Sequence, residues 1–251
     1  ARADAFSDMR TVTARISYPA RVGGIAVAYG QVLPFVEAET ESREAIDAWL
    51  RVRAEEMILF WNTEAPPLAQ QANLRAWAAM AITQIGLILD EPAYLEWGLL
   101  SQQIILDTQD EDGSLPLEMR RGKYGLHYQL HALAPMSVTT ALLCQAGYRN
   151  PEYYEALLEE AVAFSLEAIE DPKIAEEITG KPQTIKPGLD KQKNFVLAWL
   201  EAYLNFTFDP RLDERLESFR PLKNSKLGGD LTMLYRNNLD RPLGCRERDN
   251  I

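Results

Sequence analysis

Residues 43–61 read REAIDAWLRVRAEEMILFW, and their apolar side chains recur three or four positions apart. That spacing places them on one face of a helix with 3.6 residues per turn, which is typical of a helix packed against a core. The stretch therefore predicts an amphipathic helix. Its apolar face is formed by Ile46, Trp49, Leu50, Met57, Phe60 and Trp61.

The same helical periodicity continues along most of the chain. Strand-like alternation is nearly absent, and short turns such as DEDGSLP at residues 110–116 separate the periodic segments. Helices joined by short connections run antiparallel to their neighbours. We therefore predict an all-α fold, with further helices over residues 70–89, 94–107, 124–147, 151–169 and 194–206.

The composition is that of an ordinary folded protein of 251 residues, with 47% hydrophobic and 25% charged residues. This is enough for one sizeable core, so we expect a single domain over residues 1–251. The net charge of -11 argues against a nucleic-acid partner, whose phosphates require many Lys and Arg contacts. No segment approaches the roughly 18 apolar residues of a membrane span. The opening segment ARADAFSDMR is expected to lie inside a helix rather than at a natural start.

Several small features complete the expectations from residue patterns alone. Gly23 and Gly24 lie in an apolar segment, which favours close helix packing over phosphate binding. Cys144 lies in the apolar run TALLCQAG and is expected in the core, although a disulfide with Cys245 is possible. Residues 179–192 are expected to form a surface loop, and residues 221–251 a tail packed over the helices.

The two histidines of the chain, His127 and His131, are four positions apart and so share one helical face. Tyr128 lies between them in sequence, and three cations, Arg120, Arg121 and Lys123, precede them. A polar patch on a helix surface is the simplest interpretation of such a pair. An HxxxH pair can also bind zinc, but the glutamate of an HExxH motif and a third ligand are missing, so we expect no metal site.

Residues 115–136, LPLEMRRGKYGLHYQLHALAPM, resemble a motif of the alginate lyases of polysaccharide lyase family 5, LPxELxRxxxALxYHxYALxPL. Residues 72–78, ANLRAWA, match a second family motif, NNHxYWA. Further similarity lies in FVLAWLEAY at residues 195–203 and KLGGDLT at residues 226–232. The resemblance covers nearly the whole chain and implies an incomplete (α/α) toroid with a long substrate cleft. It also implies that an N-terminal part of the family domain is absent.

The resemblance implies a reaction, β-elimination on a uronate polymer, with polymannuronate as the first expected substrate and polyglucuronate next. A base removes the C5 proton while the O4 glycosidic bond breaks, and neither a metal nor an organic cofactor is required. Hydrogen bonds or positive charge at the uronate carboxylate stabilise the negative charge that develops. The resemblance also implies a periplasmic or secreted monomer whose partner is an anionic polysaccharide, without nucleic acid or membrane.

The matched motif positions give the candidate residues. Tyr128 is the expected acid–base residue, Arg121 and Asn73 its partners at the carboxylate, and His127 a secondary catalytic candidate. The expected substrate-binding residues are Trp77, His131, Arg120, Lys123 and Lys226.

The chain departs from the family pattern at the reacting centre. Leu74 stands where the family has its motif histidine, and it can neither donate a hydrogen bond nor take a proton. His127 precedes Tyr128 although the family's histidine follows it, and His131 stands where the family often has a second tyrosine. Leu74 therefore indicates a divergence compensated by one of the histidines, an engineered inactive variant, or a protein that only binds polysaccharide.

Two further functions stay open from the sequence. A non-catalytic binder of acidic polysaccharide, for example in polymer export, is favoured by Leu74 and opposed by the retained Arg121 and Tyr128. A helical-toroid glycoside hydrolase would use two carboxylates, for which Asp112 and Glu118 are candidates. The products distinguish the three, because only a lyase makes an unsaturated uronate that absorbs ultraviolet light.

Overall fold

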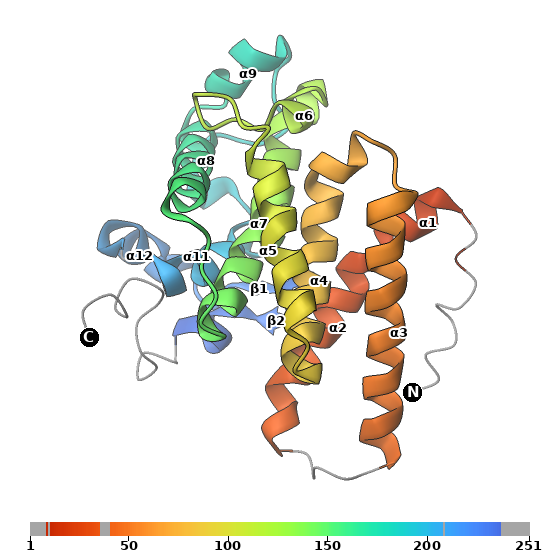
Figure 1. Ribbon diagram of the computed structural model, residues 1–251. Coiled ribbons are helices and arrows are strands. Elements are labelled where there is room, and N and C mark those ends of the chain that lie inside the picture. Colours follow the sequence, from red (N-terminus) through yellow and green to blue (C-terminus); the bar gives the residue numbers. More distant parts are fainter. Residues whose placement is uncertain (1–8, 10, 36–40, 208, 237–251) are drawn as a thin grey trace.

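The computed structural model describes residues 9, 11–35, 41–207 and 209–236, and within them it is almost entirely helical (Figure 1). The predicted all-α class is confirmed. Two two-residue strands, β1 (Lys223–Asn224) and β2 (Gly229–Asp230), pair antiparallel near the C-terminal end. The helices are α1 (Val12–Ser17), α2 (Pro19–Val32), α3 (Glu41–Thr63), α4 (Asn73–Leu89), α5 (Pro92–Leu106), α6 (Pro116–Met119), α7 (Gly125–Gln145), α8 (Glu152–Glu170), α9 (Lys173–Thr179), α10 (Asn194–Leu197), α11 (Trp199–Phe206) and α12 (Pro210–Leu216).

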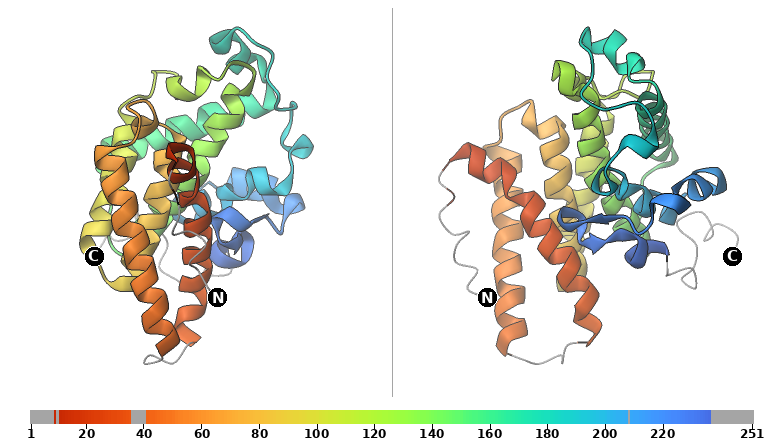
Figure 2. Two further views of the ribbon diagram at one scale, coloured as in Figure 1. Left: turned by 90° about the vertical axis from the view of Figure 1, so that its right-hand side faces the viewer. Right: turned by 180° about the vertical axis from the view of Figure 1, so that it is seen from behind.

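Helix α4 lies at the centre of the molecule and contributes to both hydrophobic clusters. One side of it packs with α2 and α3 in the first cluster, through residues such as Ile82 and Ile85. Its other side packs with α7 and α11 in the second cluster, through Trp77 and Met80. Figures 1 and 2 show α4 between α3 and α7, with α1 and α2 crossing beside it. The rigid centre of the fold is therefore the helix that carries Asn73, Leu74 and Trp77.

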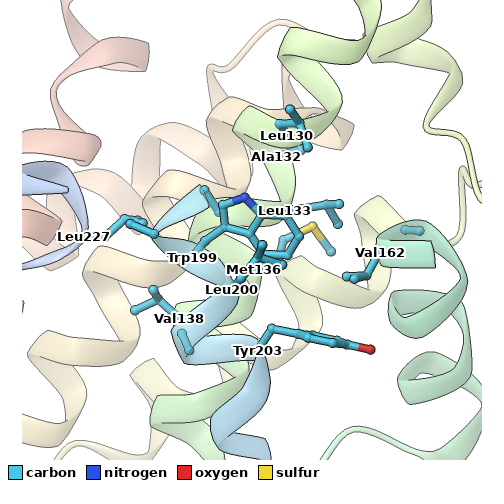
Figure 3. Close-up of a cluster of buried hydrophobic side chains, with 14 of the residues drawn as sticks. Leu130, Ala132, Leu133, Met136, Val138, Val162, Trp199, Leu200, Tyr203 and Leu227 are labelled. Carbon is cyan, nitrogen blue, oxygen red and sulfur yellow. The ribbon is translucent and has the colours of Figure 1, made fainter. Parts of the chain in front are cut away.

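The second cluster is built around the packing of α11 on α7 (Figure 3). Trp199 is 1% exposed and lies among Leu133, Met136 and Leu200, so it is a core residue, as aromatic residues at helical spacing usually are. Cys144 lies at the end of α7, half-buried rather than in the core as expected, and it is disulfide-bonded. Cys245 and the expected helix at residues 1–8 and 10 lie outside the described residues.

The expected close packing at Gly23 and Gly24 is confirmed. A Cβ atom on Gly23 would lie 2.6 Å from the Met80 side chain of α4. One on Gly24 would lie 2.6 Å from the Ser225 backbone oxygen, in the short 3-10 turn Ser225–Leu227. The absence of a side chain at Gly23 and Gly24 lets α2 pack closely against α4 on one side and against the turn Ser225–Leu227 on the other. Helix α2 therefore holds this turn, which includes Lys226, close to α4.

An ion-pair network fixes the C-terminal segment to the core. Arg220 donates to both carboxylate oxygens of Glu201 on α11, at 2.8 and 3.1 Å, and both side chains are almost fully buried. Thr232 donates to the same carboxylate at 2.6 Å and accepts from the Leu222 backbone at 2.8 Å. The segment from β1 to β2 is thereby held beside α2 and α11. No helix within the described residues is long and apolar enough to cross a membrane.

Candidate functional site

Tyr128 and Arg121 face each other at the start of α7. The Arg121 guanidinium carbon lies 4.9 Å from the centroid of the Tyr128 ring, which is a cation–π contact. Arg121 is exposed, and Tyr128, in the first turn of α7, is half-buried. The short helix α6 ends at Met119, and the Arg121 backbone N–H bonds the Glu118 carbonyl at 3.0 Å. Arg121 is thereby carried on a tight, ordered turn directly before Tyr128.

The loop after α9 holds this turn in place. Gln183 accepts a bond from the Leu126 backbone N–H at 3.0 Å and donates to the Gly122 carbonyl at 3.1 Å. The Thr184 backbone N–H bonds the Lys123 carbonyl at 3.0 Å. Residues 179–192 form the expected surface loop, and Gln183 and Thr184 within it hold the turn that carries Arg121.

Asn73 is buried and bound to a carboxylate. Its backbone N–H and its side-chain amide both donate to Glu118, each at 2.7 Å, and the two residues are each 1% exposed. Burial raises the pKa of Glu118 above its ordinary value, while the bonds from Asn73 and the charge of Arg121 oppose that shift. Because the amide donor of Asn73 is already engaged, it positions α4 against α6 in this structure rather than facing outward toward a ligand.

Trp77 is also buried, and its polar group is hydrogen-bonded to His131. Its indole N–H donates to His131 Nδ1 at 2.8 Å, and the two ring centroids are 5.0 Å apart. Trp77 is 2% exposed, so it offers no ring face on which a sugar could stack. The Lys226 ammonium lies 5.8 Å from the indole centroid. The residues of α4 that the sequence proposed for contact with substrate thus lie behind the site and support it.

The rings of α7 form the surface of the site. His127 lies with its ring centroid 5.4 Å from that of Tyr128, and the His131 centroid is 6.2 Å from Tyr128 and 6.4 Å from His127. Partial burial and then the charge of Lys226 lower the pKa of His127. Burial, then Lys226, then His127 lower the pKa of His131 to about 4. Both histidines are therefore held in the neutral form near pH 7.

The depressed pKa of His131 has a consequence for folding. An unfolded histidine takes up its proton near pH 6.5, whereas folded His131 does so only near pH 4. The unfolded state binds more protons in between, so this residue's contribution to stability is full above pH 6.5 and is lost as the pH falls toward 4. We expect the unfolding free energy of the parent, relative to His131→Gln, to fall by about 2 kcal/mol from pH 7.5 to 5. Urea unfolding at both pH values measures this, and a pH-independent difference would contradict it.

The remaining candidates lie around these rings or away from them. Arg120, Lys123 and Lys226 are exposed, with Lys123 5.1 Å from the Tyr124 ring centroid. Leu74 is half-buried and packs against the cluster of α2 and α3. Asp112 is exposed and accepts a bond from the Ser114 backbone N–H at 2.8 Å, as in a turn. Glu118 accepts bonds from Asn73 on both oxygens, so each of the two carboxylates proposed for a hydrolase is already hydrogen-bonded within the fold.

Two residues that brace the site, Glu118 and Gln183, were not predicted to do so. Glu118 was considered only as a hydrolase carboxylate, and its partner Asn73 is 45 positions away. Gln183 reaches Gly122 across 61 positions. The only sequence feature that pointed to either residue was the glutamate of the motif segment LPLEM, which is Glu118. No group of three His, Cys, Asp or Glu side chains in the described part of the chain could hold a metal ion.

The alginate lyase family model matches residues 25–175, which is more than half of the chain. The chain belongs to the alginate lyase family. An alginate lyase of Pseudomonas fluorescens strain SBW25 is 27% identical over 220 residues, and one of strain Pf-5 is 30% identical over 199 residues. These matches cover 85% and 78% of this chain but 57% and 52% of the relatives. This alginate lyase family member thus spans little more than half the length of those proteins.

Solved structures of alginate lyases show the same fold. The crystal structure of alginate lyase A1-III from Sphingomonas species A1 matches with a TM-score of 0.70 at 23% identity, covering 87% of this chain and 62% of that one. A histidine-to-alanine variant of A1-III complexed with a tetrasaccharide matches with a TM-score of 0.73 at 22% identity, covering 88% and 62%. The predicted incomplete (α/α) toroid is therefore confirmed for this alginate lyase family member.

Proposed function

We propose that this protein is a polysaccharide lyase that cleaves an acidic uronate polymer by β-elimination, with polymannuronate as the first candidate substrate. The observation that carries the proposal is the Arg121 guanidinium held over the ring of Tyr128, in a chain of the alginate lyase family. An alginate lyase in complex with a tetrasaccharide has the same fold, which supports a saccharide ligand. We treat the chain as one alginate-lyase-like domain.

In the proposed reaction, the deprotonated phenol oxygen of Tyr128 takes the C5 proton of the uronate and becomes a neutral phenol. The electron pair of that C–H bond forms the C4–C5 double bond while the C4–O4 bond breaks. The phenol of Tyr128 then gives its proton to the departing O4 oxygen, so that one chain ends in an unsaturated uronate, the other ends in a free hydroxyl, and Tyr128 is again deprotonated. Arg121, next to the ring, would supply positive charge to the uronate carboxylate, on which negative charge develops.

The exposed cations around Tyr128 would hold the polymer. Arg120, Arg121 and Lys123 precede α7, and Lys226 approaches from the turn beside α2. Salt screens charges beyond about 8 to 10 Å, so a local group of cations attracts a polyanion even though the net charge is -11. We propose a periplasmic or secreted monomer whose partner is an anionic polysaccharide, without a nucleic-acid or membrane partner.

The direct test of activity is the ultraviolet absorbance of unsaturated product. Three polymers are supplied separately: polymannuronate, polyglucuronate and hyaluronan. We expect unsaturated product from polymannuronate, at the highest rate of the three. A hydrolase would raise reducing ends without ultraviolet absorbance. If none of the three polymers gives either ultraviolet-absorbing product or new reducing ends, the proposed enzyme activity is contradicted.

The proposed binding surface makes a prediction about salt. We expect the Kd for oligomannuronate to rise as NaCl increases from 20 to about 300 mM, since screening weakens contacts between exposed cations and carboxylates. Arg121→Ala should weaken binding at low salt and flatten the dependence. Arg211→Ala, an exposed arginine on the distant α12, is the matched control and should change neither. Salt-independent binding by the parent, measured by calorimetry, would rule out the proposed surface.

A second candidate function is favoured by Leu74. A leucine that packs against the cluster of α2 and α3 supplies no donor to the reacting carboxylate. A protein that only binds acidic polysaccharide would tolerate that change. Saturable polymer binding without ultraviolet-absorbing product, from protein at high concentration over a day, would favour this function over the lyase.

A further inference from the structure

The hydrogen bond between Trp77 and His131 determines which nitrogen of the imidazole carries the proton. An indole N–H is a donor only, so His131 Nδ1, 2.8 Å away, must be an unprotonated acceptor. In a neutral imidazole the proton is then on Nε2. Because Trp77 is 2% exposed and fixed in the core on α4, the orientation of the ring is fixed as well.

The other nitrogen of His131 is directed away from the buried indole. The two ring nitrogens point in diverging directions, so Nε2 faces away from Trp77, and this nitrogen is not among the fully buried polar atoms that lack a partner. Within the described residues, no protein acceptor bonds this N–H. The groups around the ring are Trp77 of α4, His127 and Tyr128 of α7, and Lys226 of the turn Ser225–Leu227. None of these groups is a carboxylate, so the site offers a donor with no acidic partner of its own.

We propose that His131 Nε2–H donates a hydrogen bond to the carboxylate of the uronate residue bound beside Tyr128. It thereby supplies, from α7, the donor that Leu74 cannot supply from α4. This inference rests on the proposed function and names the residue that binds the reacting group. His131 remains a neutral donor near pH 7, because its pKa of about 4 keeps the imidazole in the neutral form with a single N–H.

A role confined to structure is the alternative, since the same bond links α4 to α7. Three substitutions separate the two roles. His131→Gln extends an amide N–H to about the position of Nε2, whereas His131→Asn keeps an oxygen near Nδ1 for Trp77 but is too short to replace Nε2. His131→Phe fills the space and offers neither group. If His131 has only a structural role, the His131→Asn protein should bind substrate as the parent does. If His131 binds the carboxylate, the His131→Gln protein should instead be the one that resembles the parent.

The experiment measures the Kd for tetramannuronate by calorimetry at pH 7.5, together with the thermal midpoint of each variant. We expect His131→Asn and His131→Phe to bind roughly 10- to 100-fold more weakly, which is the typical effect of losing a hydrogen bond to a charged group. His131→Gln should bind within about threefold of the parent.

The tautomer is tested independently of any ligand. Nitrogen-15 NMR of the two histidines from pH 5 to 8 should show the His131 proton on Nε2 throughout, and no titration of that ring. Titration near pH 6.5, or a proton on Nδ1, would overturn the inference. So would His131→Asn or His131→Phe protein that is folded and binds tetramannuronate as the parent does. If the parent itself neither binds nor cleaves polyuronate, the proposed function fails, and this inference fails with it.

Discussion

Tyr128→Phe is expected to abolish formation of unsaturated product while leaving the fold intact. A positioned acid–base group typically contributes roughly 10²- to 10⁴-fold to a rate, and the substitution removes only the hydroxyl that would carry the proton. The ring stays in place for the contact with Arg121. The affinity for polymannuronate should stay within about tenfold, because one hydroxyl is a single contact on an extended surface.

The structure makes this substitution a clean one. Tyr128 is half-buried, and its hydroxyl makes no hydrogen bond to the described residues, so its removal leaves no buried group without a partner. The thermal midpoint should therefore be unchanged within error. Tyr124→Phe, on an exposed tyrosine one turn earlier, is the matched control and should keep the parent rate. Unsaturated product at the parent rate from Tyr128→Phe would exclude Tyr128 as the acid–base residue.

Much of the helical fold was predictable from local periodicity. The helix predicted over residues 43–61 extends over Glu41–Thr63, and the one predicted over residues 151–169 is Glu152–Glu170. Both have one apolar and one polar face, so burial imposes a visible 3.6-residue pattern. The predicted helix over residues 194–206 is interrupted at Ala198, between α10 and α11. Helix α2 was not predicted, since its small residues, such as Gly23 and Gly24, contact neighbours on several sides and leave no apolar stripe.

The candidate site was predictable only where its residues are close in sequence. The spacing of His127 and His131 correctly placed both on one side of α7, with ring centroids 6.4 Å apart. Contacts between distant segments left no such signal, and Trp77 meets His131 across 54 positions. Burial was the other missing quantity. A motif identifies Asn73 and Trp77 as candidates, but only the packed structure shows that both are covered and that their polar groups point to other residues of the site.

Glu118→Ala is expected to cause the largest loss of stability among substitutions near the site. It would leave the backbone N–H and the side-chain amide of Asn73 buried without acceptors. An unsatisfied buried donor costs about 1 to 3 kcal/mol, so the two together should lower the unfolding free energy by about 2 to 5 kcal/mol. Glu118→Gln should lose less, because its carbonyl oxygen still accepts one of the two bonds.

The same substitution should also lower the elimination rate by at least about tenfold at temperatures where the variant is folded. The carboxylate of Glu118 links α6 to Asn73 of α4, and the backbone carbonyl of Glu118 accepts the N–H of Arg121. Without the carboxylate, the turn that holds the Arg121 guanidinium against Tyr128 should become less ordered. Urea unfolding gives the stability, and the ultraviolet assay gives the rate. Glu111→Ala, on an exposed residue of the preceding turn, is the control and should change stability by less than about 0.5 kcal/mol. Equal stability of the Glu118→Ala and Glu111→Ala proteins would show that the Asn73–Glu118 pair does not hold the site together.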